Sequence, residues 1–334
     1  MQVRQLGDSD VQVSAIIFGA WAIGGWMWGG AEEKDAIEAI HASIEGGATS
    51  IDTAAIYGYG RSEEIVGKAI KGKRDKVQIL TKFGLRWDST EGEHFFDWDD
   101  EENGAKTIYR NARKKSIIHE CEQSLKRLGT DYIDLYQCHW RDSSTPVEET
   151  MEALNQLLKE GKIKAAGVSN FTVEDMKKAR AVCPIASDQP PYSMVLRDIE
   201  KDILPYCHKE NIGVIVYSPL QRGLLTGKFK PDVKFKDGDH RANEKHFQPE
   251  NIKRVNAFLE KIKPIAESHN VTIGQLVIAW TIAQKGVTAA IVGARDAAQC
   301  KENMQADLVK LSDEEIDKIN SELGSLKLEP AAAK

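Results

Sequence analysis

Four polar side chains of complementary chemistry stand at or just beyond the ends of short apolar runs in this sequence: Asp52, Tyr57, Lys82 and His139. A phenol has an unperturbed pKa of about 10, and a neighbouring ammonium group stabilises the phenolate and lowers that pKa. We expect Lys82 to supply this charge to Tyr57, and Asp52 to hold Lys82 in its charged form. His139 can hydrogen-bond a carbonyl oxygen and orient it. Together the four suit protonation of an oxygen that becomes negative as a hydride ion arrives.

Each of these residues also has an ordinary structural interpretation. An aspartate at a strand end often caps the strand or forms an ion pair, and a lone lysine after a strand is usually solvated. A lone histidine is more often a structural side chain than a catalyst, and Tyr57 by itself can pack at the surface. Their positions at the ends of successive predicted strands favour the catalytic interpretation over four separate structural ones.

The elements that must position these residues alternate between short apolar runs and amphipathic helical stretches. After a β-hairpin formed by residues 3–6 and 11–13, we expect barrel strands at 14–19, 49–52, 77–82, 133–139, 165–168, 186–189, 213–217 and 290–292. The helices expected between and after them are 33–45, 62–70, 116–128, 146–159, 173–181, 198–210, 272–283, 296–304 and 312–323. Ser62 is the expected N-cap of its helix.

Eight strand–helix units imply parallel strands, because each return to a parallel neighbour needs a crossover connection. At this length a closed (α/β)8 barrel is the natural architecture, and a doubly wound sheet is the alternative. No Pro/Gly-rich linker divides the chain, so we expect residues 1–328 to form a single barrel domain. Residues 329–334 are expected to form a disordered tail.

Two long segments, 83–104 and 220–250, interrupt the alternation of strands and helices. The first is acidic and rich in aromatic residues, and the second is charged and contains several glycines. Long loops of this kind are more often functional than merely connective. Both follow predicted strands, so in a barrel both would lie at the carboxyl end, where active sites are built.

Charge and cysteine usage exclude several classes of function. The net charge is −6, the pI is about 5.8, and no basic stripe predicts a nucleic-acid partner. The five cysteines are widely spread and include no C-x-x-C pair, so neither a disulfide framework nor a structural zinc site is expected. The amino terminus lacks the apolar region of a signal peptide, and no apolar run is long enough for a membrane helix. We therefore expect a cytoplasmic protein with reduced thiols, no metal and no membrane partner.

Several motifs, in consistent order along nearly the whole chain, resemble those of the aldo-keto reductases. They are GATSIDTAAIYG at 47–58, GRSE at 60–63, TK at 81–82, DLYQCHW at 134–140, GKIKAAGVSNF at 161–171, YSPL at 217–220, GLLTGK at 223–228 and IVGAR at 291–295. The sequence most resembles bacterial general-stress-type members that are related to potassium-channel β-subunits. The resemblance implies an (α/β)8 barrel and NADPH-dependent reduction of aldehyde or ketone carbonyls to alcohols. It also implies that Asp52, Tyr57, Lys82 and His139 form the catalytic tetrad, with Tyr57 as the general acid.

The cofactor site must hold a dinucleotide without a Rossmann fingerprint. The run 58–63 lacks the third glycine of G-x-G-x-x-G, and 223–228 is too short for a P-loop. The family lays NADPH across the barrel mouth. The resemblance assigns cofactor contacts to Gly19, Ala20, Trp21, Asp52, Ser169, Asn170, Gln189, Tyr217, Ser218, Pro219, Leu220, Gln221, Gly223, Lys228, Gly293, Arg295, Gln299 and Asn303.

Within this set the expected roles differ. The hydroxyl and amides of Ser169, Asn170 and Gln189 suit the nicotinamide carboxamide, and Tyr217 can stack on the nicotinamide ring. The backbone of 218–223, with Lys228 nearby, suits the pyrophosphate. Arg295 precedes a helix amino terminus, which favours an anionic 2′-phosphate, and Gln299 and Asn303 can contact adenine. Tyr217 as core packing and Arg295 as a surface charge remain the structural alternatives. Ala294 stands where many members carry serine, which weakens the choice of NADPH over NADH.

Five tryptophans are the candidates for the apolar wall of the substrate pocket: Trp21, Trp26, Trp28, Trp87 and Trp140. The leading hypothesis is an enzyme with a small-molecule carbonyl substrate and no obligatory protein partner. The second is a cofactor-binding regulatory subunit like a channel β-subunit. The chain begins at the hairpin without an inactivation extension, and this argues against that role. A metal-dependent barrel hydrolase is a third interpretation, but it would need clustered His/Asp ligands that the sequence lacks.

Overall fold

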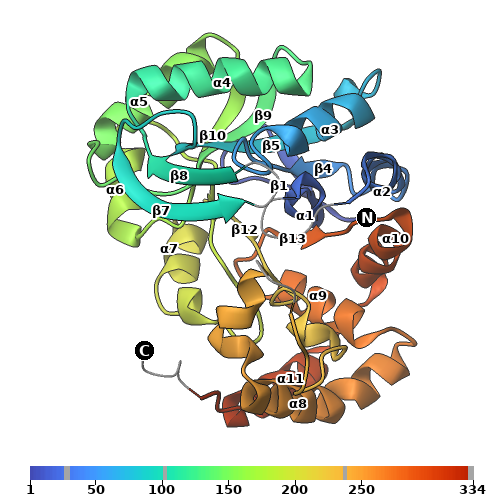
Figure 1. Ribbon diagram of the computed structural model, residues 1–334. Coiled ribbons are helices and arrows are strands. Elements are labelled where there is room, and N and C mark those ends of the chain that lie inside the picture. The colour runs from blue at the N-terminus through green and yellow to red at the C-terminus, as the bar shows by residue number, and fades with distance from the viewer. Residues whose placement is uncertain (26–30, 101–103, 236–238, 330–334) are drawn as a thin grey trace.

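The computed structural model describes residues 1–25, 31–100, 104–235 and 239–329, and it contains a closed barrel of eight parallel strands (Figure 1). Around the barrel the order is β3, β4, β5, β9, β10, β11, β12 and β13, and β13 pairs back onto β3. Their bounds are Ile16–Gly19, Ser50–Asp52, Gln78–Phe83, Ile133–Cys138, Ile163–Ser169, Ser187–Gln189, Gly213–Val216 and Ala289–Gly293. The predicted (α/β)8 barrel is confirmed, and the doubly wound alternative is wrong.

An antiparallel hairpin, β1 (Val3–Gln5) and β2 (Gln12–Ser14), closes the amino end of the barrel. Leu6, Val11 and Val13 of this hairpin are buried in one cluster with apolar residues of the barrel strands. Those partners are Ile17, Leu80, Leu135, Ala165, Ala186, Ile215, Ala289 and Ile291. The hairpin predicted from the sequence is therefore confirmed, and it acts as an apolar plug.

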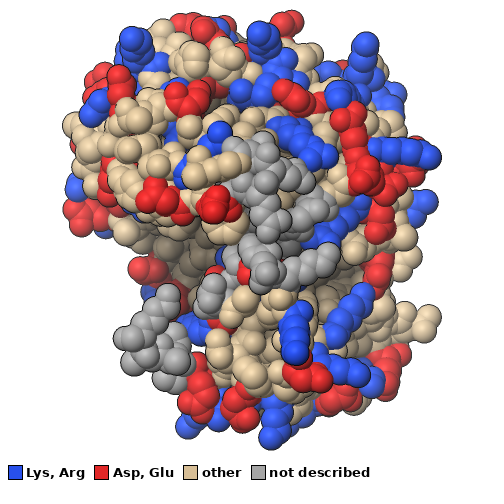
Figure 2. Space-filling model, in the orientation of Figure 1, with Lys and Arg blue, Asp and Glu red and all other residues tan. Residues whose placement is uncertain are grey.

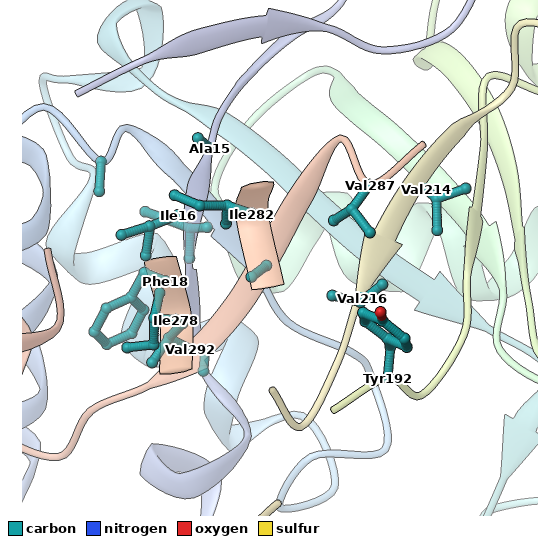
Figure 3. Packing of buried hydrophobic residues seen from close by; sticks show 14 of the residues in the cluster. Ala15, Ile16, Phe18, Tyr192, Val214, Val216, Ile278, Ile282, Val287 and Val292 are labelled. Carbon is teal, nitrogen blue, oxygen red and sulfur yellow. The ribbon is translucent and has the colours of Figure 1, made fainter. Parts of the chain in front are cut away.

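Helices cover the outside of the barrel, as the amphipathic stretches predicted. They are α2 (Glu33–Glu45), α3 (Arg61–Ala69), α4 (Lys114–Leu128), α5 (Val147–Lys159), α6 (Val173–Arg180), α7 (Ile203–Lys209), α9 (Ile273–Ala283) and α10 (Ala297–Met304). In Figure 3, Ile278 and Ile282 of α9 lie beside Ile16 and Phe18 of β3 and Val292 of β13, all in one buried cluster. This layer of apolar side chains joins α9 to the barrel wall.

Two helix predictions need correction. Gly60, in the left-handed conformation, is the N-cap of α3, whereas Ser62 is buried and its hydroxyl donates to the Ala20 carbonyl at 2.8 Å. The stretch predicted as one helix over 198–210 is a 3-10 turn, Asp198–Glu200, followed by α7. A four-residue helix, α1 (Trp21–Gly24), follows β3.

A 20-residue helix that the sequence analysis did not predict, α8 (Pro249–Ser268), packs with α11 (Asp313–Ser325) at one end of the molecule (Figure 1). The backbone N–H of Glu329 donates to Asn251 on α8 at 2.8 Å, so the chain is held to this helix at that residue. The remaining residues of the predicted tail lie outside the described part of the chain.

The acidic, aromatic segment that the sequence predicts to be a loop is largely an antiparallel sheet. It consists of β6 (Leu85–Arg86), β7 (Glu93–Asp100) and β8 (Gly104–Arg110), paired in the order β6–β8–β7. In Figure 1, β7 and β8 curve across one side of the barrel. We call β6, β7 and β8, together with Trp87 next to β6, the aromatic sheet. The second long segment is irregular as expected, with 3-10 turns at Leu224–Thr226, His240–Asn243 and Lys245–Phe247.

Positive and negative side chains are intermixed over the face of the molecule shown in Figure 2, in keeping with the interspersed charges of the sequence. Within the described residues, no helix combines the length and apolar character that a bilayer crossing requires. The five cysteines are all buried free thiols.

Candidate active site

A buried ion pair occupies the carboxyl end of the barrel. Asp52 is the last residue of β4, and Lys82 lies near the end of the neighbouring β5. The Lys82 ammonium donates to Asp52 Oδ1 at 2.6 Å and to the Thr53 carbonyl at 2.8 Å, and its side chain is 0% exposed. Burial lowers the pKa of Lys82 and raises the pKa of Asp52, while the attraction between the two opposes both shifts. The fold therefore holds both groups in a buried site where loss of water disfavours their charged forms.

Tyr57 reaches this pair from the loop that follows β4. Its hydroxyl lies 3.4 Å from Lys82 Nζ, and its ring stacks on Trp21 with the centroids 5.9 Å apart. Gly58 permits the turn: it has φ +61°, and a Cβ there would lie 2.0 Å from the Gly24 carbonyl oxygen. The local sequence therefore needs glycine immediately after the tyrosine.

The pKa of Tyr57 moves in the opposite direction to the one expected from Lys82. Burial, followed by the charge of Asp52, raises the pKa of Tyr57 well above its usual value. The expected lowering rested on the neighbouring ammonium, whereas loss of water around the phenol has the larger effect on its pKa. Tyr57 consequently keeps its proton at neutral pH, which leaves it a donor and not a base.

His139 follows β9 and faces the same opening. Its backbone N–H donates to the Phe83 carbonyl at 3.0 Å, and its ring meets the Tyr57 ring edge-on, with centroids 5.8 Å apart and an interplanar angle of 80°. Burial, together with the charge of Lys82, holds the pKa of His139 well below its usual range. The imidazole is therefore neutral at physiological pH, and one ring nitrogen remains a hydrogen-bond donor.

Gln189 belongs to the same polar cluster, a contact that the sequence analysis missed. Its Nε2 donates to Asp52 Oδ2 at 2.8 Å, so Lys82 and Gln189 each bind one oxygen of the carboxylate. A signal was available in the sequence, because Gln189 and Asp52 are each the last residue of a barrel strand. Because the amide nitrogen of Gln189 donates to Asp52, a bound ligand would be expected to contact its side-chain oxygen.

Asn170 links the backbone of His139 to the predicted nicotinamide contacts. Its Nδ2 donates to the His139 carbonyl at 3.1 Å and to Ser169 Oγ at 3.0 Å, and its Oδ1 accepts the Tyr217 hydroxyl at 2.9 Å. Tyr217 lies one residue beyond β12 and not within it. The structure thus brings Ser169, Asn170 and Tyr217 together beside His139.

One barrel mouth thus holds a buried lysine–aspartate pair, a tyrosine and a histidine. Comparison of the sequence with known protein families agrees with this arrangement. The sequence pattern of the Aldo/keto reductase family matches residues 15–323. The chain belongs to the aldo/keto reductase family. It is 41% identical over 302 residues to the Aldo-keto reductase YhdN of Bacillus subtilis, covering 90% of this chain and 86% of that protein. It is 37% identical over 319 residues to the NADH-specific methylglyoxal reductase of Escherichia coli, covering 94% and 95%.

A solved structure supports the same assignment. The glycerol dehydrogenase AKR11B4 of Gluconobacter oxydans matches 99% of this chain and 98% of its own, with 38% identity and a TM-score of 0.88. As an aldo/keto reductase, this chain is an oxidoreductase of the class that reduces carbonyl groups with a nicotinamide cofactor. The family and reaction class implied by the sequence resemblance are confirmed.

The loop after β12 carries the residues expected to lie against a pyrophosphate. Ser218, Gln221, Arg222 and Gly223 all have positive φ, from +44° to +91°, and the N–H groups of Gln221 and Gly223 donate within this turn to the Ser218 and Leu220 carbonyls at 2.8 and 3.0 Å. Pro219 and Leu220 lie within this turn, and Lys228 is exposed just after it. The Gln221 side chain is buried and accepts the Ser193 hydroxyl at 2.8 Å, and the Gln221 backbone N–H donates to the Ser218 carbonyl at 2.8 Å, so both groups hold the turn together.

The turn between β13 and α10, together with α10 itself, carries the residues expected to bind the adenosine end, and it lies beside the other cofactor contacts predicted at the end of β3. Gly19 and Gly293 pair directly across β3 and β13, and Ala20 and Trp21 continue from Gly19. Arg295 is exposed ahead of α10, whose N-cap is Asp296. Gln299 Oε1 accepts the Arg295 N–H at 3.0 Å, and Asn303 Nδ2 donates to the Gly293 carbonyl at 3.1 Å. These two amides brace the turn in the described structure.

Three of the predicted pocket tryptophans lie in one aromatic cluster around Tyr57: Trp21, Trp87 and Trp140. Phe95 of β7 packs on Trp140 with ring centroids 5.6 Å apart, and Trp87 packs on Tyr59 at 5.7 Å. Trp26 and Trp28 lie outside the described residues. The described residues contain no group of three or more His, Cys, Asp or Glu side chains arranged to hold a metal.

Proposed function

We propose that this protein is an NADPH-dependent reductase of aldehydes and ketones, with Tyr57 as the acid that protonates the carbonyl oxygen. The observation that carries the proposal is the Tyr57 hydroxyl at 3.4 Å from a fully buried ammonium, which is itself fixed by Asp52 and the Thr53 carbonyl. In this arrangement the Tyr57 hydroxyl can donate its proton, and the Lys82 ammonium lies beside the phenolate oxygen that remains.

Bound nicotinamide supplies the hydride to the carbonyl carbon. The carbonyl oxygen then gains negative charge, and the Tyr57 phenol transfers its proton to that oxygen. An alkoxide is far more basic than a phenolate, so the transfer stays favourable even though burial raises the pKa of Tyr57. Lys82 stabilises the phenolate that remains, and Asp52 keeps the ammonium in position. The neutral His139 donates a hydrogen bond that orients the carbonyl oxygen before the transfer.

The residues present fit a dinucleotide. The glycines paired at Gly19 and Gly293 leave the strand ends without side chains, and a Cβ on Gly19 would come within 2.8 Å of Ile291. In a complex with the dinucleotide, the turn at 218–223 would hold the pyrophosphate and Tyr217 would contact the nicotinamide. The preference for NADPH rests on Arg295, an exposed cation at the amino end of α10, where a 2′-phosphate would be favoured.

Steady-state oxidation of NADPH and of NADH tests this proposal, with methylglyoxal and 4-nitrobenzaldehyde as substrates. Tyr57→Phe should reduce kcat about 10²- to 10⁴-fold, the usual contribution of a general acid, while cofactor binding stays intact. Tyr59→Phe is the matched control, since Tyr59 lies two residues further along the same loop and should keep a near wild-type kcat. A Tyr57→Phe enzyme with wild-type turnover would refute the assignment of the acid. A higher kcat/KM with NADH would refute the cofactor.

A further inference from the structure

The aromatic sheet is inserted between β5 and α4, and its two ends meet at one point. Gly84 directly follows β5 and has φ +96°. Its carbonyl accepts the backbone N–H of Asn111, the residue after β8, at 3.0 Å. Gly84 and Asn111 therefore form a common root for the sheet, and this root lies only two residues along the chain from Lys82.

The carboxylate of Glu120, on the barrel helix α4, binds the backbone of this root. The residue is 4% exposed, and its Oε2 accepts the Gly84 N–H at 2.9 Å while its Oε1 accepts the Ser116 hydroxyl at 3.0 Å. Arg86 of β6 in turn donates to Ser116 Oγ at 2.6 Å and forms an ion pair with Asp88. One buried carboxylate thus connects a barrel helix to both the backbone and a side chain at the start of the aromatic sheet.

The far side of the aromatic sheet packs over Tyr57. Leu85 and Ile108 of the sheet are buried in the same cluster as Ala54, Ile56 and Tyr57. Partly buried aromatic residues of the sheet pack against that cluster: Trp87, Phe95, Phe96 and Trp98. A small rotation of the sheet about its root would consequently move this aromatic wall relative to the Tyr57 hydroxyl.

We propose that Glu120 is a positioning residue for the carbonyl substrate, because it fixes the root of the aromatic sheet and so sets the wall of the opening over Tyr57. The substrate part of this inference rests on the proposed function. Glu120 is not in contact with Tyr57 or Lys82 through any of its hydrogen bonds, so it should act on substrate binding and leave the proton transfer unchanged. Its effect should therefore fall on KM and not on kcat.

The charge of Glu120 adds a pH dependence of defined sign. Burial raises the pKa of Glu120 from 4.5 to about 7, and the facing groups are Arg86 and Asp88 on the sheet side and Tyr136 and Cys138 on β9. A displaced sheet would expose Glu120 and return its pKa toward the ordinary value. The docked sheet then binds more protons between about pH 4.5 and 7, so docking weakens as pH rises through this window and is constant above it.

Kinetics with NADPH and 4-nitrobenzaldehyde test the positioning role. Glu120→Ala leaves the Gly84 N–H without its acceptor, and KM should rise about tenfold, the change that 1.4 kcal/mol makes in an equilibrium constant, with kcat within about twofold. Glu120→Gln keeps an acceptor oxygen and should restore KM. It should also remove the rise of KM that the wild type shows from pH 5 to 7. Glu122→Gln, an exposed change two residues along α4, should match the wild type in every respect.

Hydrogen–deuterium exchange of the free protein provides a readout that needs no activity. Glu120→Ala should accelerate exchange in peptides covering 85–98 and 104–110 while the barrel strands stay protected, and Glu120→Gln should not. Unchanged exchange in these peptides, a uniform acceleration over the barrel, or a loss in kcat instead of KM would each overturn the positioning role. If Glu120→Ala does not fold, the KM–pH profiles of wild type and Glu120→Gln decide, since identical profiles contradict the proposal. An enzyme inactive toward aldehydes would refute the proposed function alone.

Discussion

The two ends of the barrel hold the strands together in different ways. At the amino end, Leu6, Val11 and Val13 of the hairpin pack against apolar barrel residues, and this contact excludes water without burying charge. At the carboxyl end, the space between the strands is filled by Lys82, Asp52 and polar amides. The pKa of Lys82 is lowered and that of Asp52 is raised, because burial opposes both charges.

This difference separates residues kept for stability from residues kept for chemistry. Burial of apolar surface is favourable by itself, at roughly 25 cal/mol per Å². A buried ion pair gains little over a well-packed apolar pair of similar volume, because desolvation of the charges offsets their attraction. The charged carboxyl end is thus explained by the proposed reaction, whereas the apolar amino end is explained by folding alone. Mutations at the two ends should therefore have opposite effects on activity and on stability.

The largest expected effect comes from removing both charges at the carboxyl end. Asp52→Asn combined with Lys82→Met should lower kcat/KM about 10²- to 10⁴-fold, because the phenolate of Tyr57 loses its counter-charge. The free energy of unfolding should stay near the wild-type value or rise. Urea denaturation and steady-state kinetics on the same preparations measure both quantities.

The single variant Lys82→Met provides the control for this double change. It leaves the Asp52 carboxylate buried with neutral amide donors and without its counter-charge, so the free energy of unfolding should fall by about 3–5 kcal/mol. Its activity should be no higher than that of the double variant, since residues that act as a unit are non-additive. If the activity losses of Asp52→Asn and Lys82→Met simply multiply, the proposed coupling of Asp52, Lys82 and Tyr57 is wrong.

The opposite pattern is expected at the amino end. Leu6 is fully buried, and Leu6→Ala should lower the free energy of unfolding by about 2–5 kcal/mol, while kcat/KM of the folded enzyme stays unchanged. Val3 is 57% exposed on the same hairpin, so Val3→Ala should change stability by less than about 0.5 kcal/mol. A large fall in kcat/KM for Leu6→Ala at a temperature where the protein is folded would show that the two ends are not independent.

Arg295→Ala tests a smaller electrostatic effect at the mouth of the barrel. The variant should weaken NADPH binding by about 1.5–3 kcal/mol, the range for a hydrogen bond to a charged group, and should change NADH binding far less. Fluorescence titration with both cofactors measures the difference. Lys301→Ala, an exposed change further along α10, should alter neither affinity. Equal losses for the two cofactors would remove Arg295 from the proposed 2′-phosphate site.

The alternation of apolar runs and helices was sufficient to predict the barrel, because the barrel strands are short, mostly buried and separated by amphipathic helices. The aromatic sheet was not predicted, and its register explains why. A shift between His94 and Phe96 interrupts the pairing of β7 with β8. Adjacent Phe95 and Phe96 therefore do not follow the period of two that identifies a strand. Without that period, the segment has the composition of a loop.

The missed helix α8 did carry signals. Pro249 stands at its first position, where proline is favoured, and apolar residues recur at helical spacing. Pro264 inside the helix and the many charged residues weaken that pattern. The direction of the Tyr57 pKa shift is a different case, because it depends on how deeply the phenol is buried. The spacing of residues in the sequence can indicate which charged side chains lie near Tyr57. It does not indicate how far the phenol is buried from water.

The last prediction concerns the pH dependence of stability, which the carboxyl end should control through His139. Its pKa is held well below the usual value in the folded protein, by burial and by Lys82. The unfolded chain therefore binds a proton near pH 6.5 that the folded chain does not bind, and stability should fall as pH drops through this value. His139→Gln should reduce the fall in unfolding free energy between pH 7 and pH 5 by about 1–2 kcal/mol. His94→Gln on β7, where the side chain is 53% exposed, should leave that fall unchanged. Parallel pH–stability curves for wild type and His139→Gln would show that His139 takes up its proton in the folded state, and would contradict its proposed role as a neutral donor.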